Sequence, residues 1–293
     1  MWSTSPRSVL PRGRFFGCRT HKLWTQLTAH ATLLVTSAVF VAPLIFMIST
    51  SLKSHRQMQS WPPTIIPNPV IWRNYTDVFD YAPLHRYMWN TLLVAIFWVF
   101  GATVTSSLAG YAFGRLRAPG RNMVFYVLLS TLMVPGIVTM IPTYIIFSKL
   151  QWVDTFLPLI IPPLLGSPFY IFLMRQFLLT IPMDLEDAAL IDGCSHFGTW
   201  RRIMLPLAKP ALATVAIFAF MWAVNDFMGP LIYLNSKRLY TLSLGLQVFR
   251  RSHGTEWGML MAASTMMVTP IIVLFFFAQK QFVQGITLTG LKG

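Results

Sequence analysis

The stretch IPMDLEDAALIDGCSHFGTWRRIMLPLAKP, at residues 181–210, is a polar insert between two long apolar runs of the chain. It contains four of the nine acidic residues, whereas the segments on either side are almost free of charge. A polar segment with its own internal order, placed on one side of a bilayer, is typical of a docking element for a soluble partner. The insert therefore predicts a docking surface, provided that the apolar runs cross a membrane.

Six apolar runs make up most of the chain, and their lengths predict the fold. Hydrophobic residues form 55% of the 293 and charged residues only 11%, which leaves too little polar surface for a soluble globule. Each run has about the 20 residues with which an α-helix crosses about 30 Å of hydrocarbon, and none alternates like a barrel strand. We predict an all-α membrane protein with six transmembrane helices, at 29–52, 87–114, 122–148, 155–174, 210–236 and 257–279.

The predicted organisation is a basic arm at residues 1–28 followed by one six-helix domain at 29–293. The arm contains five Lys and Arg residues and no acid, and the apolar run after it is too long for a cleaved signal peptide. The short loop 115–122 contains three arginines. By the positive-inside rule we expect this loop, the insert and both termini in the cytoplasm. The positive charge is then a topology signal, with contact to membrane lipid as the alternative, and we expect no nucleic-acid partner.

The sequence contains no motif for chemistry of its own. Its two cysteines, Cys18 and Cys194, are far apart and both expected on the cytoplasmic side, where a structural disulfide is not expected. Its six histidines show no metal-binding spacing, and no G-x-x-x-x-G-K-[ST] motif is present to hold the phosphates of ATP. We therefore expect a chain that is not an enzyme and that carries no cofactor.

The insert has the pattern of a short helix with a defined stop. Pro182 closes the fourth apolar run, and Asp184 stands at the expected N-cap. Glu186 and Asp187 follow in the first turn, where acids suit the positive end of the helix dipole. Gly193 supplies the residue that ends a helix with φ > 0. One face is small and partly apolar, formed by Leu185, Ala188, Ala189 and Asp192. A docking helix and an ordinary connector are the two interpretations of this pattern.

The insert resembles the EAA loop of permease subunits in ABC importers, through the string DAALIDG at 187–193 followed by LPL at 205–207. In that family the loop forms the coupling helix that sits in a cleft of the ATPase subunit. Asp187 replaces the usual Glu, which shortens the reach of the acid, and Cys194 replaces the usual Ala. The resemblance implies ATPase-coupling roles for Glu186, Asp187, Ala188, Ala189, Asp192, Gly193, Leu205 and Pro206.

Three further motifs extend the resemblance to nearly the whole chain: YAFGRL at 111–116, NDF at 225–227 and GITLTGLKG at 285–293. Together they resemble the carbohydrate-type permeases of the maltose and glycerol-phosphate kinds. The resemblance implies a type I ABC importer permease fold in the plasma membrane of a prokaryote. It also implies a second permease subunit, an ATPase dimer that carries ATP and Mg, and an extracytoplasmic solute-binding protein.

Asp226 is the only acid inside an apolar run. Such an acid costs about 2.5–3.5 kcal/mol on insertion scales, so we expect it to face a cavity or a partner. With Asn225 beside it, it is a candidate for the translocation path, where both side chains would hydrogen-bond a sugar-like solute. A structural contact with the second permease subunit is the alternative.

A secondary transporter or channel that works without ATP is the alternative function. Such proteins generally need more charge within the membrane and a detectable internal repeat, and neither is evident in this sequence.

An ABC importer permease must move its transmembrane helices, which needs flexible points within them. Proline provides such points because it kinks a helix by removing a backbone hydrogen bond. The candidates, which are also consistent with fixed kinks, are Pro135, Pro142, Pro158, Pro162, Pro163 and Pro168.

Overall fold

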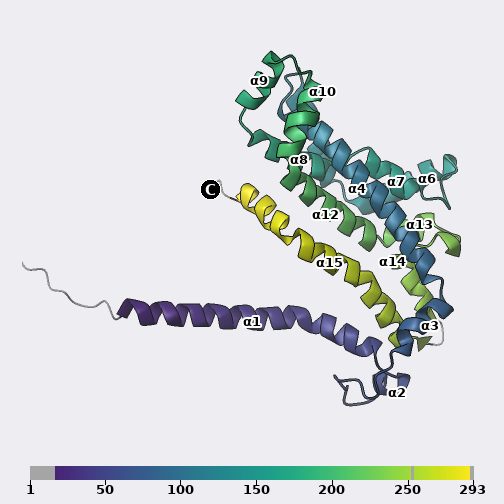
Figure 1. Cartoon of the computed structure of the whole chain (residues 1–293). Coiled ribbons are helices and arrows are strands. Elements are labelled where there is room, and N and C mark those ends of the chain that lie inside the picture. Colours follow the sequence, from purple (N-terminus) through teal and green to yellow (C-terminus); the bar gives the residue numbers. More distant parts are fainter. Residues whose placement is uncertain (1–16, 252–253, 291–293) are drawn as a thin grey trace, which may run out of the picture.

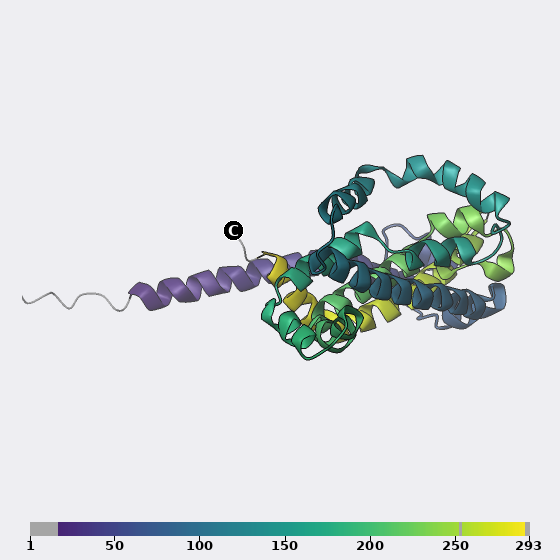
Figure 2. The same ribbon diagram turned by 90° about the horizontal axis from the view of Figure 1, so that it is seen from above.

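The computed structural model describes residues 17–251 and 254–290, and nearly all of its ordered elements are helices. The longest are α1 (Gly17–Ser51), α4 (Leu84–Gly114), α12 (Lys209–Asn225) and α15 (Trp257–Gly290). Helices α4, α12 and α15 pack together in the body of the molecule (Figure 1). Helix α1 contacts α15 and then projects away from that body, as the view from above also shows (Figure 2). The predicted all-α fold is confirmed.

Four to six membrane-spanning segments can be identified among the described residues by their length and composition. Four helical segments are long and apolar enough by themselves: Thr25–Ser51, Leu84–Gly114, Leu157–Leu179 and Trp257–Phe277. Two bent pairs raise the number to six if each pair contributes one span: Arg121–Met133 with Gly136–Lys149 at 99°, and His196–Leu207 with Lys209–Asn225 at 80°. The first part of the second pair, His196–Leu207, lies within the polar insert. Residues 1–16 of the predicted basic arm lie outside the described residues, and residues 17–28 already belong to α1.

The third and fourth spans are interrupted close to their prolines. The third comprises α5 (Arg121–Ser130), η1 (Thr131–Met133) and α6 (Gly136–Lys149), and Pro135 stands at the bend. The fourth comprises α7 (Leu157–Leu164) and α8 (Pro168–Leu179), separated by a turn in which Gly166 has φ 102°. Several of these prolines stand at the start of a helix. There the N–H that proline lacks would have no partner within the helix in any case. Pro142 lies inside α6 without interrupting it.

The fifth span differs from the prediction at its end. The apolar run continues to residue 236, but helix α12 stops at Asn225, and the separate α13 (Met228–Tyr233) begins after Asp226. The chain leaves the helical conformation at Asp226, whose ψ is 113°. The acid therefore lies at a break between two helices, and its carboxylate interacts with backbone that the break exposes.

The centre of the body is a close contact between α4 and α8. Two glycines of α4 make it possible, because a Cβ on Gly110 would lie 2.7 Å from Cβ of Met174. A Cβ on Gly101 would lie 2.7 Å from Cα of Leu164 at the end of α7. Protein interiors are close-packed, so each glycine sets the distance between the two spans. Around this contact lies a buried cluster that includes Tyr111, Leu178, Met204, Ala211 and Val215.

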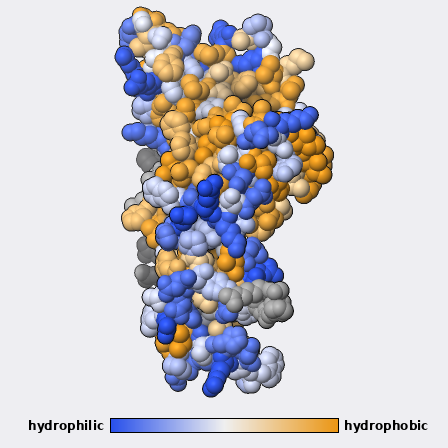
Figure 3. All heavy atoms as spheres, turned by 90° about the vertical axis from the view of Figure 1, so that its right-hand side faces the viewer, coloured by the Kyte–Doolittle hydropathy of each residue, from blue (hydrophilic) through white to orange (hydrophobic). Residues whose placement is uncertain are grey.

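The remaining elements lie at the two ends of the body. Helices α2 (His55–Met58) and α3 (Arg73–Tyr81) lie at one end and α9 (Asp184–Ile191) and α10 (His196–Thr199) at the other, with α4 running between (Figure 1). Short elements connect the spans: η2 (Trp200–Met204), α11 (Leu205–Leu207), η3 (Lys237–Leu239), α14 (Leu242–Gly245), η4 (Leu246–Phe249), β1 (Arg250–Arg251) and β2 (Gly254–Thr255). Hydrophobic side chains form a broad area on the face in Figure 3, and hydrophilic ones dominate below it, towards α2 and α3.

Candidate functional site

The polar insert folds as predicted into a short helix, with small differences at its start. Helix α8 ends at Leu179, before Pro182, and α9 begins at Asp184. Asp184 is therefore the first helical residue, and the N-cap is Met183, which makes no side-chain capping bond. The prediction that Asp184 is the N-cap was wrong by one position. Three acids do occupy the first turn, where the helix dipole favours negative charge.

Gly193 ends α9 in the predicted manner. Its φ is 82°, and its N–H donates to the carbonyl of Leu190 at 3.1 Å. The N–H of Cys194 reaches back to the carbonyl of Ala189 at 2.9 Å, so carbonyls that the helix end exposes are satisfied. No atom lies within 4 Å of a Cβ placed on Gly193, so the space around the stop is open.

The two sides of α9 have different surroundings. Glu186 and Ala189, one turn apart, are buried against this chain with exposures of 3% and 4%. The rest of the helix surface is exposed and includes apolar residues, with Leu185 at 44% and Ile191 at 86%. Asp187, Ala188 and Asp192 are also exposed. The face predicted from the sequence is therefore divided, because Ala189 points inward and its neighbours point outward.

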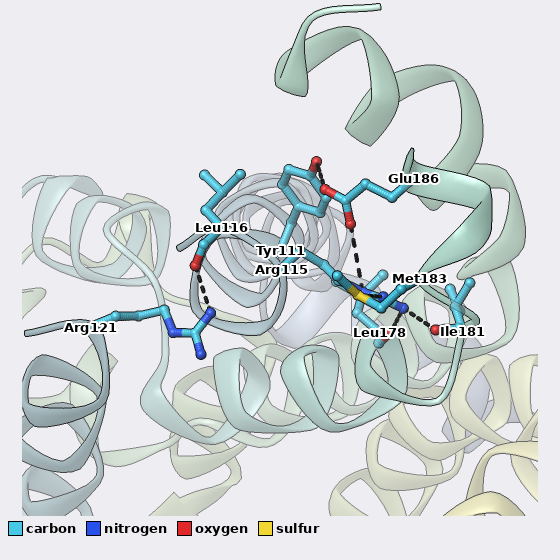
Figure 4. Close-up of polar contacts among 8 residues, drawn as sticks. All are labelled: Tyr111, Arg115, Leu116, Arg121, Leu178, Ile181, Met183 and Glu186. Atoms are coloured by element: carbon cyan, nitrogen blue, oxygen red, sulfur yellow. Dashed lines mark hydrogen bonds and ion pairs between the residues drawn. The ribbon is translucent and has the colours of Figure 1, made fainter. Parts of the chain in front are cut away.

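Glu186 enters a buried polar cluster at the end of α4 (Figure 4). Its Oε1 accepts a hydrogen bond of 2.6 Å from the hydroxyl of Tyr111, and its Oε2 lies 4.0 Å from Nε of Arg115. The guanidinium of Arg115 also donates to the carbonyls of Leu178 and Ile181, where α8 ends. A buried charge is stable only when it is paired and hydrogen-bonded, and this cluster supplies both conditions. We refer to Tyr111, Arg115 and Glu186 as the α4–α9 cluster.

Sequence reasoning did not find the α4–α9 cluster. It placed Glu186 in the first turn of the helix with an ATPase-coupling role, and it read Tyr111 and Arg115 only as part of a resemblance. Glu186 and Ala189 are three residues apart and so lie on one side of a helix, but this spacing does not show whether that side is buried. Two further predicted coupling residues lie in α11, where Leu205 packs against the main buried cluster and Pro206 is exposed.

Asp226 borders a hollow of about 610 Å³ between α4, α7, α8, α12 and α13. Its Oδ1 accepts a 3.0 Å hydrogen bond from the N–H of Gly229, which holds the start of α13. Five aromatic side chains line the same hollow: Trp98, Phe169, Tyr170, Trp222 and Tyr233. Asn225 does not line the hollow; it is exposed, and its amide donates to the carbonyl of Met221 at 2.8 Å. The structure therefore does not bring Asn225 and Asp226 to one surface.

The described part of the chain contains no group of three or more His, Cys, Asp or Glu side chains placed to hold a metal ion. Two charged features within it bear on function, the α4–α9 cluster and Asp226. The first is closed by internal contacts, and the second faces open space. The first joins two helices, and the second leaves a carboxylate at the edge of the hollow.

Comparison with known proteins extends over most of the chain. The family model for the binding-protein-dependent transport system inner membrane component matches residues 102–288. The arabinooligosaccharides transport system permease protein AraQ of Halalkalibacterium halodurans is 35% identical over 258 residues, covering 87% of this chain and 92% of that protein. The trehalose/maltose transport system permease protein MalG of Thermococcus litoralis is 31% identical over 275 residues, covering 89% and 96%.

A solved structure gives the same result for the fold. A chain from the crystal structure of a bacterial ABC transporter involved in the import of the acidic polysaccharide alginate superposes with a TM-score of 0.79. The match covers 92% of this chain and 99% of that one at 20% sequence identity. The family model, the relatives and the fold all indicate the same family. The chain belongs to the binding-protein-dependent transport system inner membrane components, the permease subunits of ABC importers.

Proposed function

We propose that this chain forms half of a translocation path for a sugar-like solute, in the plasma membrane of a prokaryote. A second permease subunit supplies the other half, and an ATPase dimer binds ATP and Mg. An extracytoplasmic binding protein delivers the solute. In this arrangement α9 is the coupling helix, the α9 end and both termini face the cytoplasm, and the arm at 1–28 precedes the permease domain at 29–293.

The observation that carries this proposal is the exposure of apolar residues on α9 and on α10 beside it. Leu185 and Ile191 on α9 and Phe197 on α10 are 44%, 86% and 60% exposed, in a segment with three acids in its first turn. Apolar side chains in a segment too polar for the bilayer are stabilised by burial against another protein. A cleft on the ATPase would cover them, and Asp187, Ala188 and Asp192 would meet the same surface.

The solute that best fits the hollow beside Asp226 is a neutral disaccharide or oligosaccharide. Aromatic rings such as Trp98 and Trp222 pack well against the apolar faces of sugar rings, and the Asp226 carboxylate accepts hydrogen bonds from hydroxyl groups. The residues that line the hollow include no Lys, Arg or His. A glycerol phosphate ester would bring its negative charge close to Asp226 without a compensating cation, so it is the weaker candidate. The named solutes of the two relatives, arabinooligosaccharides and trehalose or maltose, support this choice.

Labelling of one introduced cysteine tests the orientation and the docking surface. The variant Ala188→Cys, in a background without Cys18 and Cys194, places a thiol on the exposed side of α9. We expect an impermeant maleimide to label inverted vesicles but not intact cells. Labelling should fall when the ATPase subunit is present. Labelling of intact cells would contradict the topology, and labelling that the ATPase leaves unchanged would reduce the insert to a connector.

Solute-stimulated ATP hydrolysis tests the substrate class. The complete complex, purified with its binding protein, should hydrolyse ATP faster with a neutral oligosaccharide than with glycerol phosphate or with no solute. Stimulation by the phosphate ester alone would contradict the assignment to neutral sugars. Solute uptake by the permease without any ATPase subunit would contradict the ABC mechanism itself.

A further inference from the structure

The α4–α9 cluster joins segments that are far apart in the sequence. Tyr111 and Glu186 are 75 positions apart, yet their side chains share a 2.6 Å hydrogen bond. Arg115 stands one residue beyond α4 and reaches both the end of α8 and the carboxylate on α9. The chain itself connects α9 only to α8 and to α10. The cluster is therefore the polar connection through which α9 also contacts the second span.

The stability of the fold alone does not require a buried charged pair in this cluster. Well-packed hydrophobic residues often stabilise a fold as well as a buried ion pair or better. Here the charged side chains of Arg115 and Glu186 are almost completely buried, with exposures of 1% and 4%. A buried ion pair fixes one orientation, because a displaced partner leaves an uncompensated charge behind. The cluster thus holds α9 at one angle and position relative to α4.

One hydrogen bond that the cluster could contain, between Arg115 and Glu186, is not formed in the structure. Arg115 Nε and Glu186 Oε2 are buried and have no hydrogen-bond partner, and they are 4.0 Å apart. A shift of α9 by about 1 Å would bring them to the ~2.8 Å of a charge-assisted hydrogen bond. A small displacement of α9 therefore changes a strong contact with α4.

Helix α4 continues from this cluster to the opposite end of the molecule. There the amide of Asn90 donates to the carbonyls of Arg238 and Tyr240, at 3.0 and 2.9 Å. A Cβ on Gly245 would clash with the ring of Tyr87, so the loop at 238–245 is packed tightly against α4. One helix therefore contacts both α9 and the connecting segment between the fifth and sixth spans.

We propose that Glu186 is a positioning residue, which with Tyr111 and Arg115 fixes the coupling helix α9 to the end of α4, so that displacement of α9 moves the second span. This inference rests on the proposed function of α9. It adds the contacts by which a displacement of α9 is transmitted to the second span. Glu186 then acts inside this chain, and Asp187 on the exposed side remains the acid available to the ATPase. Force reaches the fourth and fifth spans through the chain and the second span through the cluster.

The test uses conservative variants of the cluster in the complete transporter. Tyr111→Phe removes one hydroxyl, and Glu186→Gln removes the charge but retains an oxygen that accepts a hydrogen bond. Asp184→Asn, at an exposed acid in the same turn, is the matched control. Three quantities are measured. They are the amount of intact complex, the protection by the ATPase of the thiol introduced with Ala188→Cys, and solute-stimulated ATP hydrolysis per complex.

We expect both cluster variants to retain the complex and the protection while solute stimulation falls about five-fold, the lower end of usual coupling strengths. The double variant should lose little more than the worse single one, because its two residues act as one unit. Asp184→Asn should behave like the wild type. Wild-type stimulation in both cluster variants would overturn the proposal, and so would a loss of complex with unchanged stimulation per complex. If the ATPase does not protect the introduced thiol even when the cluster is intact, the proposed function fails instead.

Discussion

Glu186 at the α9 end and Asp226 at the end of α12 are both acids in apolar surroundings, but their contacts differ. Glu186 is enclosed, with Tyr111 and Arg115 around its carboxylate. Asp226 is only partly buried; it caps the start of α13 and borders the hollow. No described side chain forms a salt bridge with Asp226. An enclosed acid fixes the position of a helix, and an acid open on one side keeps hydrogen-bonding capacity for a solute. Substitutions should therefore have different consequences in the two regions.

The largest effect is expected at the stop of the coupling helix. Gly193→Val should leave the protein in the membrane but abolish solute-stimulated ATP hydrolysis. At a φ of 82° a side chain costs roughly 1–2 kcal/mol, and a branched one would also obstruct the docking surface. The measurement is stimulated hydrolysis by the purified complex.

Gly120→Val is the matched control for that prediction. Gly120 has a φ of 76°, and nothing lies within 4 Å of a Cβ placed on it, as at Gly193. The same strain is thus introduced in the loop before α5, away from α9. Equal loss of stimulation in both variants would mean that strain rather than docking is responsible.

The next effect in size concerns the acid that borders the hollow. Asp226→Asn retains an acceptor for the N–H of Gly229, so most solute uptake should remain. Asp226→Leu removes the acceptor and the polarity together, and uptake should fall at least about ten-fold, as about 1.4 kcal/mol of lost interaction would give. Uptake is measured together with the amount of complex recovered from membranes. If Leu leaves both unchanged, Asp226 contacts neither the solute nor a partner, and the contrast with Glu186 disappears.

A third prediction tests whether α4 must remain close to α8 for the two regions to communicate. Gly110→Ala places a methyl group 2.7 Å from Cβ of Met174 and should destabilise the complex by about 1–3 kcal/mol. Thermal unfolding of the detergent-solubilised complex measures this loss. Gly136→Ala, where nothing lies within 4 Å of the new Cβ, should leave the midpoint unchanged. Equal midpoints for both variants would show that the α4–α8 contact adapts to the extra volume.

The smallest effect is expected at a third acid, in a loop outside the spans. Hydrogen bonds from the hydroxyl and N–H of Ser236 hold the pKa of Asp154 below its ordinary 3.8. A lowered folded-state pKa contributes stability that is fully present above the ordinary pKa and is lost as the pH falls through the lowered value. Asp154 has a φ of 61°, in the left-handed region, which asparagine adopts as readily as aspartate. The variant Asp154→Asn therefore removes the charge without adding backbone strain.

Limited proteolysis of the loops at 150–156 and 234–236 provides the measurement for this variant. The variant should be cleaved slightly faster than the wild type at neutral pH, and the difference should shrink as the pH falls below 3.8 and vanish once Asp154 is protonated in the folded protein. A difference that persists or grows in acid would mean that the carboxylate does not hold these loops together. Unlike Glu186, Asp154 is close to water, so its contribution should also be the most sensitive to salt.

Several features of this protein were determined by the sequence alone, because they depend on local chemistry. Six long apolar runs, of which five are uncharged and one contains only Asp226, require helices that satisfy their own backbone groups in lipid. The acids of the first turn and Gly193 define a short helix with a left-handed stop, and the structure contains both. The chain's membership of the permease family follows from motifs spread along the sequence. Each of these features can be evaluated within one turn or one span.

Only the tertiary structure determined which way each side chain of the insert faces. Glu186 and Asp187 are adjacent acids, and nothing local to them decides which one is buried. The decision comes from Tyr111 and Arg115, about 70 positions earlier. Likewise the run that contains Asp226 is apolar to residue 236, but the helix stops at Asn225, where the hollow and the start of α13 meet. Burial and pairing depend on segments far apart in the chain, and a hydrophobic pattern does not record those contacts.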